Sequence, residues 1–505
     1  MAKKVAIFGA TGYVGLILVN RLINLNWDMK LFARNTRRLL YLEEHSNIET
    51  CNTELSYENI SKLAYDLQGC ECIYYLIHSM SDAASSFETL DCNLAEIVAL
   101  SAKIAGVKQI IYLGGLGYEA SGHPLSVHLS SRHEIASILA SSSAALTEIR
   151  AGIIIGAGSA SFEIIKSLGA RLPFIPKLSY VNGFCQPIDI DSVIAYLIAV
   201  HLNEHYFNKI IEIGSSKILS YPQMVQLYAK TILQRDLKIV NIPLLEKIIS
   251  KKNLAHIIAF LSAIPYTLAK PLIEGVNSKA IINPLISDKR AFLELPTLSY
   301  EEAVKKASMY ETQGLVESFW SIPWQEQVLS PDKEKFLYID SKIPNKDLLQ
   351  ERRVKLINAT DADKIFKECL KIGGKHGYWS PKWMWAIRAF LDKLIGGTGL
   401  ESGRQTKEKK IRVGERIDFW IVSDYLDTPE FKVFTLKARL KSPGSSWLQF
   451  ALQKSNENEW KFHLRAYFRP KGIKGYLYWY SLWIVHKYIF SAMINNIIKE
   501  ALKSG

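Results

Sequence analysis

The opening of the chain combines a strand pattern, a glycine-rich turn and a helix pattern. A β-branched and aromatic run, KKVAIF, leads into Gly9, Gly12 and Gly15, which are spaced by three. This order predicts a strand, a tight turn and a helix whose N-terminus can hold an anion. In such a unit the first glycine permits the turn, the second lets backbone N–H groups approach a pyrophosphate, and the third lets the helix pack closely. The alternative is a β–α turn without a ligand.

We therefore expect a dinucleotide to contact this turn and the start of the helix. The residues placed there are Gly9, Thr11, Gly12, Tyr13, Val14 and Gly15. The second predicted strand, Met29–Ala33, ends on Arg34, and Arg37 follows closely. Arginine at this position pairs with the 2′-phosphate of NADP, whereas an acidic residue accepts from the ribose of NAD. NADP is favoured, with NAD as the alternative cofactor and a solvated basic turn as the alternative structure.

Composition gives few limits on function. The chain has 505 residues, is 48% hydrophobic and carries a net charge of +13. The basic residues are scattered, which indicates a solvated surface and no nucleic-acid partner. Six cysteines show no CxxC pairs and no metal-ligand spacing, which is typical of reduced thiols. No secretory signal precedes the first strand, so we expect a cytoplasmic protein.

One apolar segment, Tyr476–Ile498, has the length of a membrane span. His486 and Lys487 lie at its middle, where a bilayer centre would penalise a charge. We therefore expect a buried or interfacial helix of a globular domain. Contact with a membrane surface is the less favoured alternative.

Strand and helix patterns alternate in the first third of the chain. Strands are predicted within 46–55, 72–77 and 109–113, with helices over 57–67 and 90–105. Alternation of this kind predicts an α/β fold with a doubly wound parallel sheet. Residues at the carboxyl ends of the strands line the cofactor crevice, so Leu76, His78 and Leu113 are candidates. A hydrogen-bonded structural histidine is the alternative for His78.

These motifs resemble the short-chain dehydrogenase/reductase superfamily, in its atypical or extended, NmrA-like branch. The resemblance rests on GATGYVG, the arginine-bearing second strand, AGVKQIIYLGG, RAGIIIG, SASFEII and QPIDIDSVIAYL, and it covers roughly residues 1–315. It implies an NAD(P)-binding Rossmann domain with a substrate lobe, which we assign to residues 1–325. Apolar helical pieces between Val240 and Gly275, cut by prolines, suit that lobe.

The catalytic pattern of the superfamily is changed in this sequence. The resemblance implies a serine after the fifth strand and a Tyr-x-x-x-Lys helix, but Gly114-Gly115 and His128-x-x-x-Arg132 stand there. His128 could serve as an acid or base, and Arg132 could hold ribose or phosphate oxygens; the alternative is a polar helix face. Asn93 matches the family residue that orients a water or the backbone near this helix. Glu54 stands near the family's adenine-contacting aspartate.

Residues 335–505 show a different pattern. Trp320–Lys333 reads as a connection, after which strands are predicted at 351–359, 417–422, 431–440, 447–452 and 460–468. The last strand alternates apolar and polar residues, which predicts one apolar face and one wet face. With one long final helix, this is a helix-grip arrangement and resembles the START-like, or SRPBCC, hydrophobic-ligand domains, found behind atypical reductases in bacteria. Candidates to line a cavity are Trp383, Trp385, Trp479 and Trp483; ordinary core packing is the alternative.

The leading hypothesis is an NADP(H)-binding oxidoreductase that acts on a hydrophobic carbonyl or quinone-like compound. The rival is a non-catalytic NADP(H)-sensing or hydrophobic-ligand-carrier protein that keeps the reductase scaffold. The missing Ser, Tyr and Lys favour the rival, and the intact cofactor turn favours the first. The substrate, the pathway and the oligomeric state are left open by the sequence.

Overall fold

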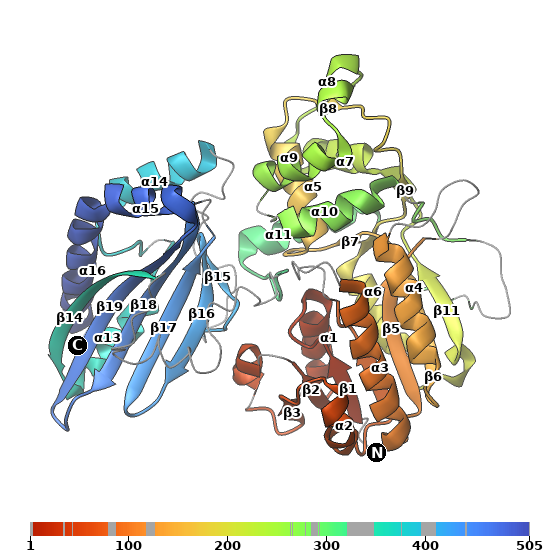
Figure 1. Cartoon of the computed structure of the whole chain (residues 1–505), viewed down its shortest axis with the longest axis horizontal. Coiled ribbons are helices and arrows are strands. Elements are labelled where there is room, and N and C mark those ends of the chain that lie inside the picture. The colour runs from red at the N-terminus through yellow and green to blue at the C-terminus, as the bar shows by residue number, and fades with distance from the viewer. Residues whose placement is uncertain are drawn as a thin grey trace. The chain divides into compact units, whose positions relative to one another are not determined.

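The computed structural model consists of two compact units, one within Met1–Pro323 and one within Trp324–Gly505 (Figure 1). The residues that it describes are 4–33, 36–42, 44–78, 87–117, 127–262, 264, 266–277, 279–283, 291, 293–320, 348–374, 376–394, 411–439 and 442–503. Each unit is described by itself below.

The first unit is built on a seven-stranded sheet in which all neighbouring strands are parallel. In their order across the sheet the strands are β11 (Lys209–Ile213), β6 (Ala145–Ala151), β5 (Gln109–Gly115), β4 (Cys72–Tyr75), β1 (Lys4–Phe8), β2 (Asp28–Phe32) and β3 (Ile48–Cys51). The predicted parallel sheet is confirmed. The third strand is shorter than predicted, because only Ile48–Cys51 pairs with β2.

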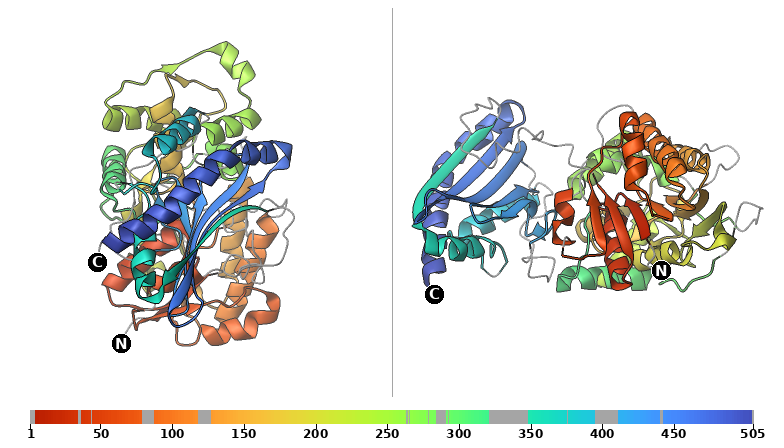
Figure 2. Two further views of the ribbon diagram at one scale, coloured as in Figure 1. Left: turned by 90° about the vertical axis from the view of Figure 1, so that its left-hand side faces the viewer. Right: turned by 90° about the horizontal axis from the view of Figure 1, so that it is seen from below.

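Helices cover both faces of this sheet (Figure 2). On one face α1 (Tyr13–Asn24) and α6 (Ile190–Ala199) pack on inward residues such as Ile7 and Ile111. On the other face α2 (Ile60–Asp66), α3 (Phe87–Ala105) and α4 (Val127–Ala140) pack on Phe8 and Tyr112. Strand residues are buried on both faces, as expected for a parallel sheet covered by helices. This is the doubly wound arrangement predicted from the sequence.

The rest of the first unit forms a helical lobe beyond β6. Its helices are α5 (Ala160–Arg171), α7 (Tyr221–Leu233), α8 (Pro243–Ile248), α9 (Lys251–Leu261), α10 (Tyr266–Glu274) and α11 (Tyr300–Gln313). Two-residue strands form three small sheets: β7 (Ile154–Ile155) with β10 (Ile188–Asp189), β8 (Ile175–Pro176) with β13 (Ile239–Val240), and β9 (Phe184–Cys185) with β12 (Leu219–Ser220). The first unit as a whole also contains short 3₁₀ turns: η1 (Thr36–Leu42), η2 (Tyr57–Asn59), η3 (Glu204–Tyr206) and η4 (Gly275–Asn277).

The second unit contains a six-stranded sheet whose neighbouring strands are all antiparallel. Its strands, in their order across the sheet, are β14 (Leu349–Asn358), β19 (Glu459–Pro470), β18 (Gly444–Lys454), β17 (Phe431–Ala438), β16 (Trp420–Asp427) and β15 (Arg416–Ile417). Its helices are η5 (Ala359–Asp361), α13 (Ala362–Cys369), α14 (Lys382–Leu394), α15 (Gly472–Ser481) and α16 (Trp483–Lys503).

One face of this sheet packs directly on α13 and α16. Phe450 and Phe462 from the sheet share an apolar core with Met493, Ile494 and Ile497 of α16. Side chains therefore fill the layer between this face and the helix in the described part of the second unit.

The opposite face was predicted to be wet, and this prediction is wrong. His463 and Arg465 are each 2% exposed, and only Lys461 at the strand start is exposed. Arg465 Nη1 donates to Gln449 Oε1 at 3.3 Å, and Gln449 Nε2 donates to Thr435 Oγ1 at 3.1 Å. Arg465, Gln449 and Thr435 come from paired positions on three neighbouring strands and are hydrogen-bonded to one another, which favours their burial.

The segment Tyr476–Ile498 was predicted to be a single helix, but the helix is interrupted at Leu482, between α15 and α16. Leu482 closes the first helix by donating to the carbonyl oxygen of Trp479, and His486 restarts the ladder by donating to Leu482. Within the described ranges, no helix has both the length and the apolar character needed to cross a membrane.

Candidate functional site

The glycine turn between β1 and α1 requires glycine at its first and third positions. Gly9 has φ +82°, and a Cβ there would lie 2.7 Å from the carbonyl oxygen of Leu76. A Cβ on Gly15 would lie 2.2 Å from the carbonyl oxygen of Gly9, closer than any real Cβ contact. Gly12 donates its N–H to Gly9 at 2.9 Å and is exposed. Backbone contact therefore leaves no room for a side chain at Gly9 or Gly15, while Gly12 stays open to a ligand.

The N-terminus of α1 has the properties of an anion site. Gly12 occupies the N-cap position, no side chain caps the helix, and its first turn contains no acidic residue. The amide groups of Tyr13, Val14 and Gly15 precede the first possible intrahelical bond, so they can be offered to a ligand. Together with the helix dipole, these N–H groups favour a phosphate. Thr11 lies in the same turn and is partly exposed.

Tyr13 contributes its backbone to this turn, because its side chain points elsewhere. The phenol lies against Gly156, where an added Cβ would be 2.3 Å from Tyr13 Oη. Burial, reinforced by the nearby carboxylates of Asp191, Glu311 and Glu317, raises the pKa of Tyr13 well above its usual value. The side chain is therefore part of the packing between α1 and the lobe.

The residues predicted to read the adenine end are described only in part. Arg34 and the side chain of Arg37 lie outside the described residues. Arg38 in η1 is buried, and burial lowers its pKa to about 10. Glu54 is an exposed residue beyond β3, where its carbonyl oxygen accepts from Asn59 Nδ2 at 3.1 Å.

A histidine and an aspartate meet beyond the end of β4. His78 Nδ1 lies 3.8 Å from Asp91 Oδ2 of α3, and the carboxylate is 8% exposed. Burial and the positive charge of Arg132 lower the pKa of His78, and Asp91 partly offsets them. The charges of Asp91 and Arg132 therefore act in opposite directions on His78 at the carboxyl edge of the sheet. Leu76 next to them donates its N–H to Phe8 at 2.9 Å, which fixes the strand end beside the glycine turn.

Arg132 is held against the end of β5. Its guanidinium donates from Nη2 to the carbonyl oxygen of Leu113 and lies 5.8 Å from the ring centre of Tyr112. The side chain fits because Gly115 has no Cβ; one added there would lie 3.2 Å from Arg132 Cδ. The side chain of His128, one turn earlier on α4, lies outside the described residues.

An ion pair on the neighbouring strand was missed by the sequence analysis. Glu148 of β6 is 2% exposed and accepts from Arg150 Nε at 2.8 Å and Nη2 at 2.9 Å. A Cβ on Gly114 would lie 2.8 Å from Glu148 Oε1. The sequence did carry a signal for this ion pair: Glu148 and Arg150 stand at alternate positions of a buried strand, and such charges are rarely buried unless paired. Gly114-Gly115 thus makes room for charged side chains from both neighbouring elements.

Asn93 of α3 lies toward the β3 side of the sheet. Its Oδ1 is 3.4 Å from the hydroxyl of Tyr57, which donates at 2.7 Å to Glu96. This places the amide beside η2, while Asp91, two residues earlier on the same helix, approaches His78.

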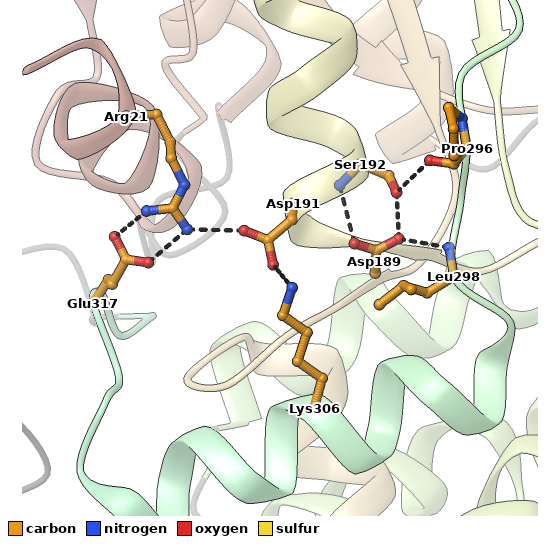
Figure 3. Close-up of polar contacts among 8 residues, drawn as sticks. All are labelled: Arg21, Asp189, Asp191, Ser192, Pro296, Leu298, Lys306 and Glu317. Carbon is orange, nitrogen blue, oxygen red and sulfur yellow. Dashed lines mark hydrogen bonds and ion pairs between the residues drawn. The ribbon is translucent and has the colours of Figure 1, made fainter. Parts of the chain in front are cut away.

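Behind the glycine turn, a charged network joins α1 to the lobe (Figure 3). Arg21 Nη2 lies 2.8 Å from Asp191 Oδ1 and 2.8 Å from Glu317 Oε1. Lys306 of α11 is 2.8 Å from the other oxygen of Asp191. Burial raises the pKa of Asp191, but hydrogen bonds from Lys306 and Arg21 outweigh it and hold this pKa below the usual value. The network fixes α1, α6, α11 and the segment after α11 to one another.

The four tryptophans proposed to line a cavity in the second unit divide into two pairs. Trp385 stacks on Tyr378 at 4.2 Å, and Trp479 stacks on Phe468 at 5.6 Å, so both belong to the packed core. Trp383 is 62% exposed and Trp483 is 53% exposed. The cavity prediction is therefore wrong for Trp383 and Trp483, which stand on outward helix faces. No group of three or more His, Cys, Asp or Glu side chains that could hold a metal occurs in the ranges given above.

Two family models match separate parts of the chain. A model described as NAD(P)H-binding covers residues 9–154, which includes the glycine turn, β4, β5 and β6. The first unit contains an NAD(P)H-binding Rossmann domain. A model described as a protein of unknown function, DUF2867, covers residues 343–493. The Rossmann domain is thus followed by a DUF2867 domain that includes the antiparallel sheet. No curated protein matches the chain.

Solved structures with a similar backbone include several sugar-nucleotide epimerases. UDP-glucose 4-epimerase from Thermotoga maritima is 14% identical with a TM-score of 0.45, over 62% of this chain and 99% of that one. A nucleoside-diphosphate-sugar epimerase from Staphylococcus aureus is 14% identical with a TM-score of 0.43, over 61% and 99%. UDP-glucuronic acid 4-epimerase from Bacillus cereus is 15% identical with a TM-score of 0.43, over 61% and 99%.

Proposed function

We propose that the protein is an NADP(H)-dependent oxidoreductase that acts on a hydrophobic carbonyl or quinone-like compound. The observation that carries this proposal is the glycine turn. Its exposed Gly12, its uncapped helix N-terminus and the 2.2 Å that would separate a Gly15 Cβ from Gly9 all suit a pyrophosphate held by backbone amides. Bound NADPH would supply a hydride at the carboxyl edge of the sheet.

The preference for NADP is proposed from the residues beyond β2. Arg34 and Arg37 follow this strand, and no Asp or Glu stands at its end. Arg38 is buried, which leaves the other two arginines as the candidates for the 2′-phosphate. Glu54 beyond β3 is exposed, as a contact with adenine requires.

The proposed chemistry uses residues of α3 and α4. Arg132 is permanently charged and lies at the end of β5, so it can stabilise negative charge that develops on a substrate oxygen. His128 is one helical turn away and can exchange a proton with that oxygen near neutral pH. To orient groups around this helix, as the resemblance implies, the Asn93 amide would have to turn away from Tyr57 of η2. These roles replace the missing serine, tyrosine and lysine.

A non-catalytic NADP(H)-sensing or ligand-carrying protein is the second candidate. The observation that favours it is the hydrogen bond from Arg132 to the Leu113 carbonyl, which uses part of the guanidinium for structure. For the second unit we propose a START-like hydrophobic-ligand domain, in which a ligand would displace side chains of the packed layer between the sheet and α16. Support comes from the antiparallel sheet with α16 packed across it and from the sequence resemblance.

The test uses the full chain. NADPH should bind at micromolar concentration and much more tightly than NADH, measured by the change in tryptophan fluorescence, and Arg34→Ala should remove the difference. NADPH oxidation with a panel of aldehydes and quinones should be lost in His128→Ala and kept in Ser130→Ala, the matched control on α4. Tight NADPH binding without turnover of any compound would favour the sensor. Equal affinity for NADH would refute the NADP preference.

A further inference from the structure

An exposed apolar stripe runs along the two helices that end the second unit. Ile473, Leu477 and Tyr480 recur at the spacing of one face of α15 and are between 62% and 79% exposed. After the break at Leu482, Ile484 at the start of α16 is 77% exposed. Trp483 and Tyr488 extend it, at 53% and 59% exposed. Gly475 and Trp479 on the opposite side of α15 are buried in the core. The helix is therefore apolar on its outer face as well as on its inner face, which a helix facing only water is not expected to be.

Helix α14, at the same end of this sheet, also exposes apolar residues. Trp383 and Ile387, one turn apart, are 62% and 51% exposed, while Trp385 is buried in the core with Trp479. Asn496 of α16 donates from Nδ2 at 2.9 Å to the carbonyl oxygen of Trp379, three residues before α14, so the start of α14 lies near α16. Figure 1 shows α14 and α15 at the same end of this sheet. We call the exposed residues of α14, α15 and the start of α16 the aromatic patch.

Lysines flank the aromatic patch along the described helices that carry it. Exposed lysines border it at Lys382, Lys471, Lys474 and Lys487. No Asp or Glu occurs between His376 and Leu391 or between Lys471 and Lys499. Lys487 lies 5.8 Å from the ring centre of Trp483, which keeps one charge beside the apolar residues.

We propose that the aromatic patch docks the protein on the surface of an anionic lipid bilayer. Tryptophan and tyrosine side chains suit the headgroup region, because an apolar ring and a polar atom can be placed at different depths. The aliphatic residues would enter the acyl boundary, and the lysines would pair with lipid phosphates. α15 and α16 would lie along the surface, since neither can cross a bilayer.

The test is flotation of the full chain with vesicles. Vesicles of phosphatidylglycerol and phosphatidylcholine should carry the protein at low salt, and pure phosphatidylcholine should carry much less. Leu477→Ser with Ile484→Ser should abolish flotation; Ile104→Ser, equally exposed on α3 at 64%, should not change it. Lys471→Glu with Lys474→Glu should weaken binding at least 25-fold, about fivefold for each lysine, whereas Lys62→Glu with Lys103→Glu should have a small effect.

A second readout reports contact directly. Brominated lipids should quench the fluorescence of Trp383 and Trp483, and part of this quenching should disappear in Trp383→Phe with Trp483→Phe. Circular dichroism of each variant checks that the fold is kept. No flotation at low salt, or equal flotation with both vesicle types, would overturn the proposal. A lipid-free dimer that dissociates in the Leu477 and Ile484 variant would overturn it as well, because a second copy would then cover the patch.

Discussion

The guanidinium of Arg132 donates to the carbonyl oxygen of Leu113 across the space that Gly115 leaves open. A Cβ on Gly115 would lie 2.7 Å from Leu129 Cδ2 and 3.2 Å from Arg132 Cδ. The glycine on β5 and the arginine on α4 therefore depend on each other. They occupy the positions at which the reductase resemblance implies serine and lysine, so the two changes form one structural adjustment.

This dependence predicts a non-additive pair of substitutions. Gly115→Ser should lower the free energy of unfolding by about 1–3 kcal/mol, because the new side chain overpacks the α4 contact. Combined with Arg132→Ala, the loss should be smaller than the sum of the two single losses. Urea unfolding of the four proteins measures this, and Ser130→Ala, exposed on the same helix, should change stability by less than about 0.5 kcal/mol. Strict additivity would show that the two residues do not interact.

Gly15→Ala should show whether the close approach of Gly15 to the Gly9 backbone is needed for NADPH binding, apart from the general effect of replacing a glycine. The added methyl would meet the Gly9 carbonyl at 2.2 Å, so the turn must open and NADPH affinity should fall at least tenfold. Gly106→Ala is the control: it also changes a glycine, at φ +71°, but no atom lies within 4 Å of its Cβ. It should cost about 1 kcal/mol of stability and leave the affinity unchanged. Calorimetric titration with NADPH compares the two variants.

The network around Asp191 predicts a pH-dependent part of the stability. The folded pKa lies below the usual 3.8, so the contribution is complete above that value and is lost as pH falls through the folded pKa. Asp191→Asn should therefore cost about 1–3 kcal/mol at pH 7 and progressively less toward pH 3. Glu71→Gln, which breaks the exposed Lys108 pair, should cost less than about 1 kcal/mol. Urea unfolding at several pH values tests this, and a constant Asp191→Asn penalty would contradict it.

His78 should be neutral at pH 7, because burial and Arg132 depress its pKa. Arg132→Gln should raise the pKa of His78 by removing the nearby positive charge, and Asp91→Asn should lower it further. Two-dimensional NMR of the imidazole nitrogens across pH measures both shifts. Movement of His78 in the opposite direction in either variant would refute the electrostatic coupling.

Much of the first unit could be predicted because its signals are local. Glycine spacing placed the β1–α1 turn, and apolar runs placed β4 and β5, since a parallel strand buried on both faces needs no partner residue to be recognised. Arg132 was found from its place on the predicted α4. The hydrogen bond from Arg132 to Leu113 was not predicted, because it depends on the distance between α4 and β5.

The wrong predictions for the second unit concern burial, which depends on elements far apart in the sequence. The polar residues of β19 alternate as a wet face would, yet His463 and Arg465 are buried. Arg465 donates to Gln449 of β18, and His463 Nδ1 lies 3.2 Å from Arg352 Nη2 of β14. Helix period alone could not tell which tryptophans point inward. Trp385 and Trp479 reach the core and Trp383 and Trp483 do not, and only the placement of α14, α15 and α16 on the sheet decides between them.

The segment that follows α11 sets the smallest useful fragment of the Rossmann unit. Val316 and Phe319 are buried, Glu317 bridges to Arg21, and Trp320 donates its N–H to Gly158 at 2.8 Å. A fragment that ended at residue 154, where the NAD(P)H-binding match stops, would lack α6 and also β11 of the seven-stranded sheet. One that ended at Gln313 would strip a carboxylate from Arg21. Crystallisation or labelling of this unit by itself should therefore keep the chain through Trp320.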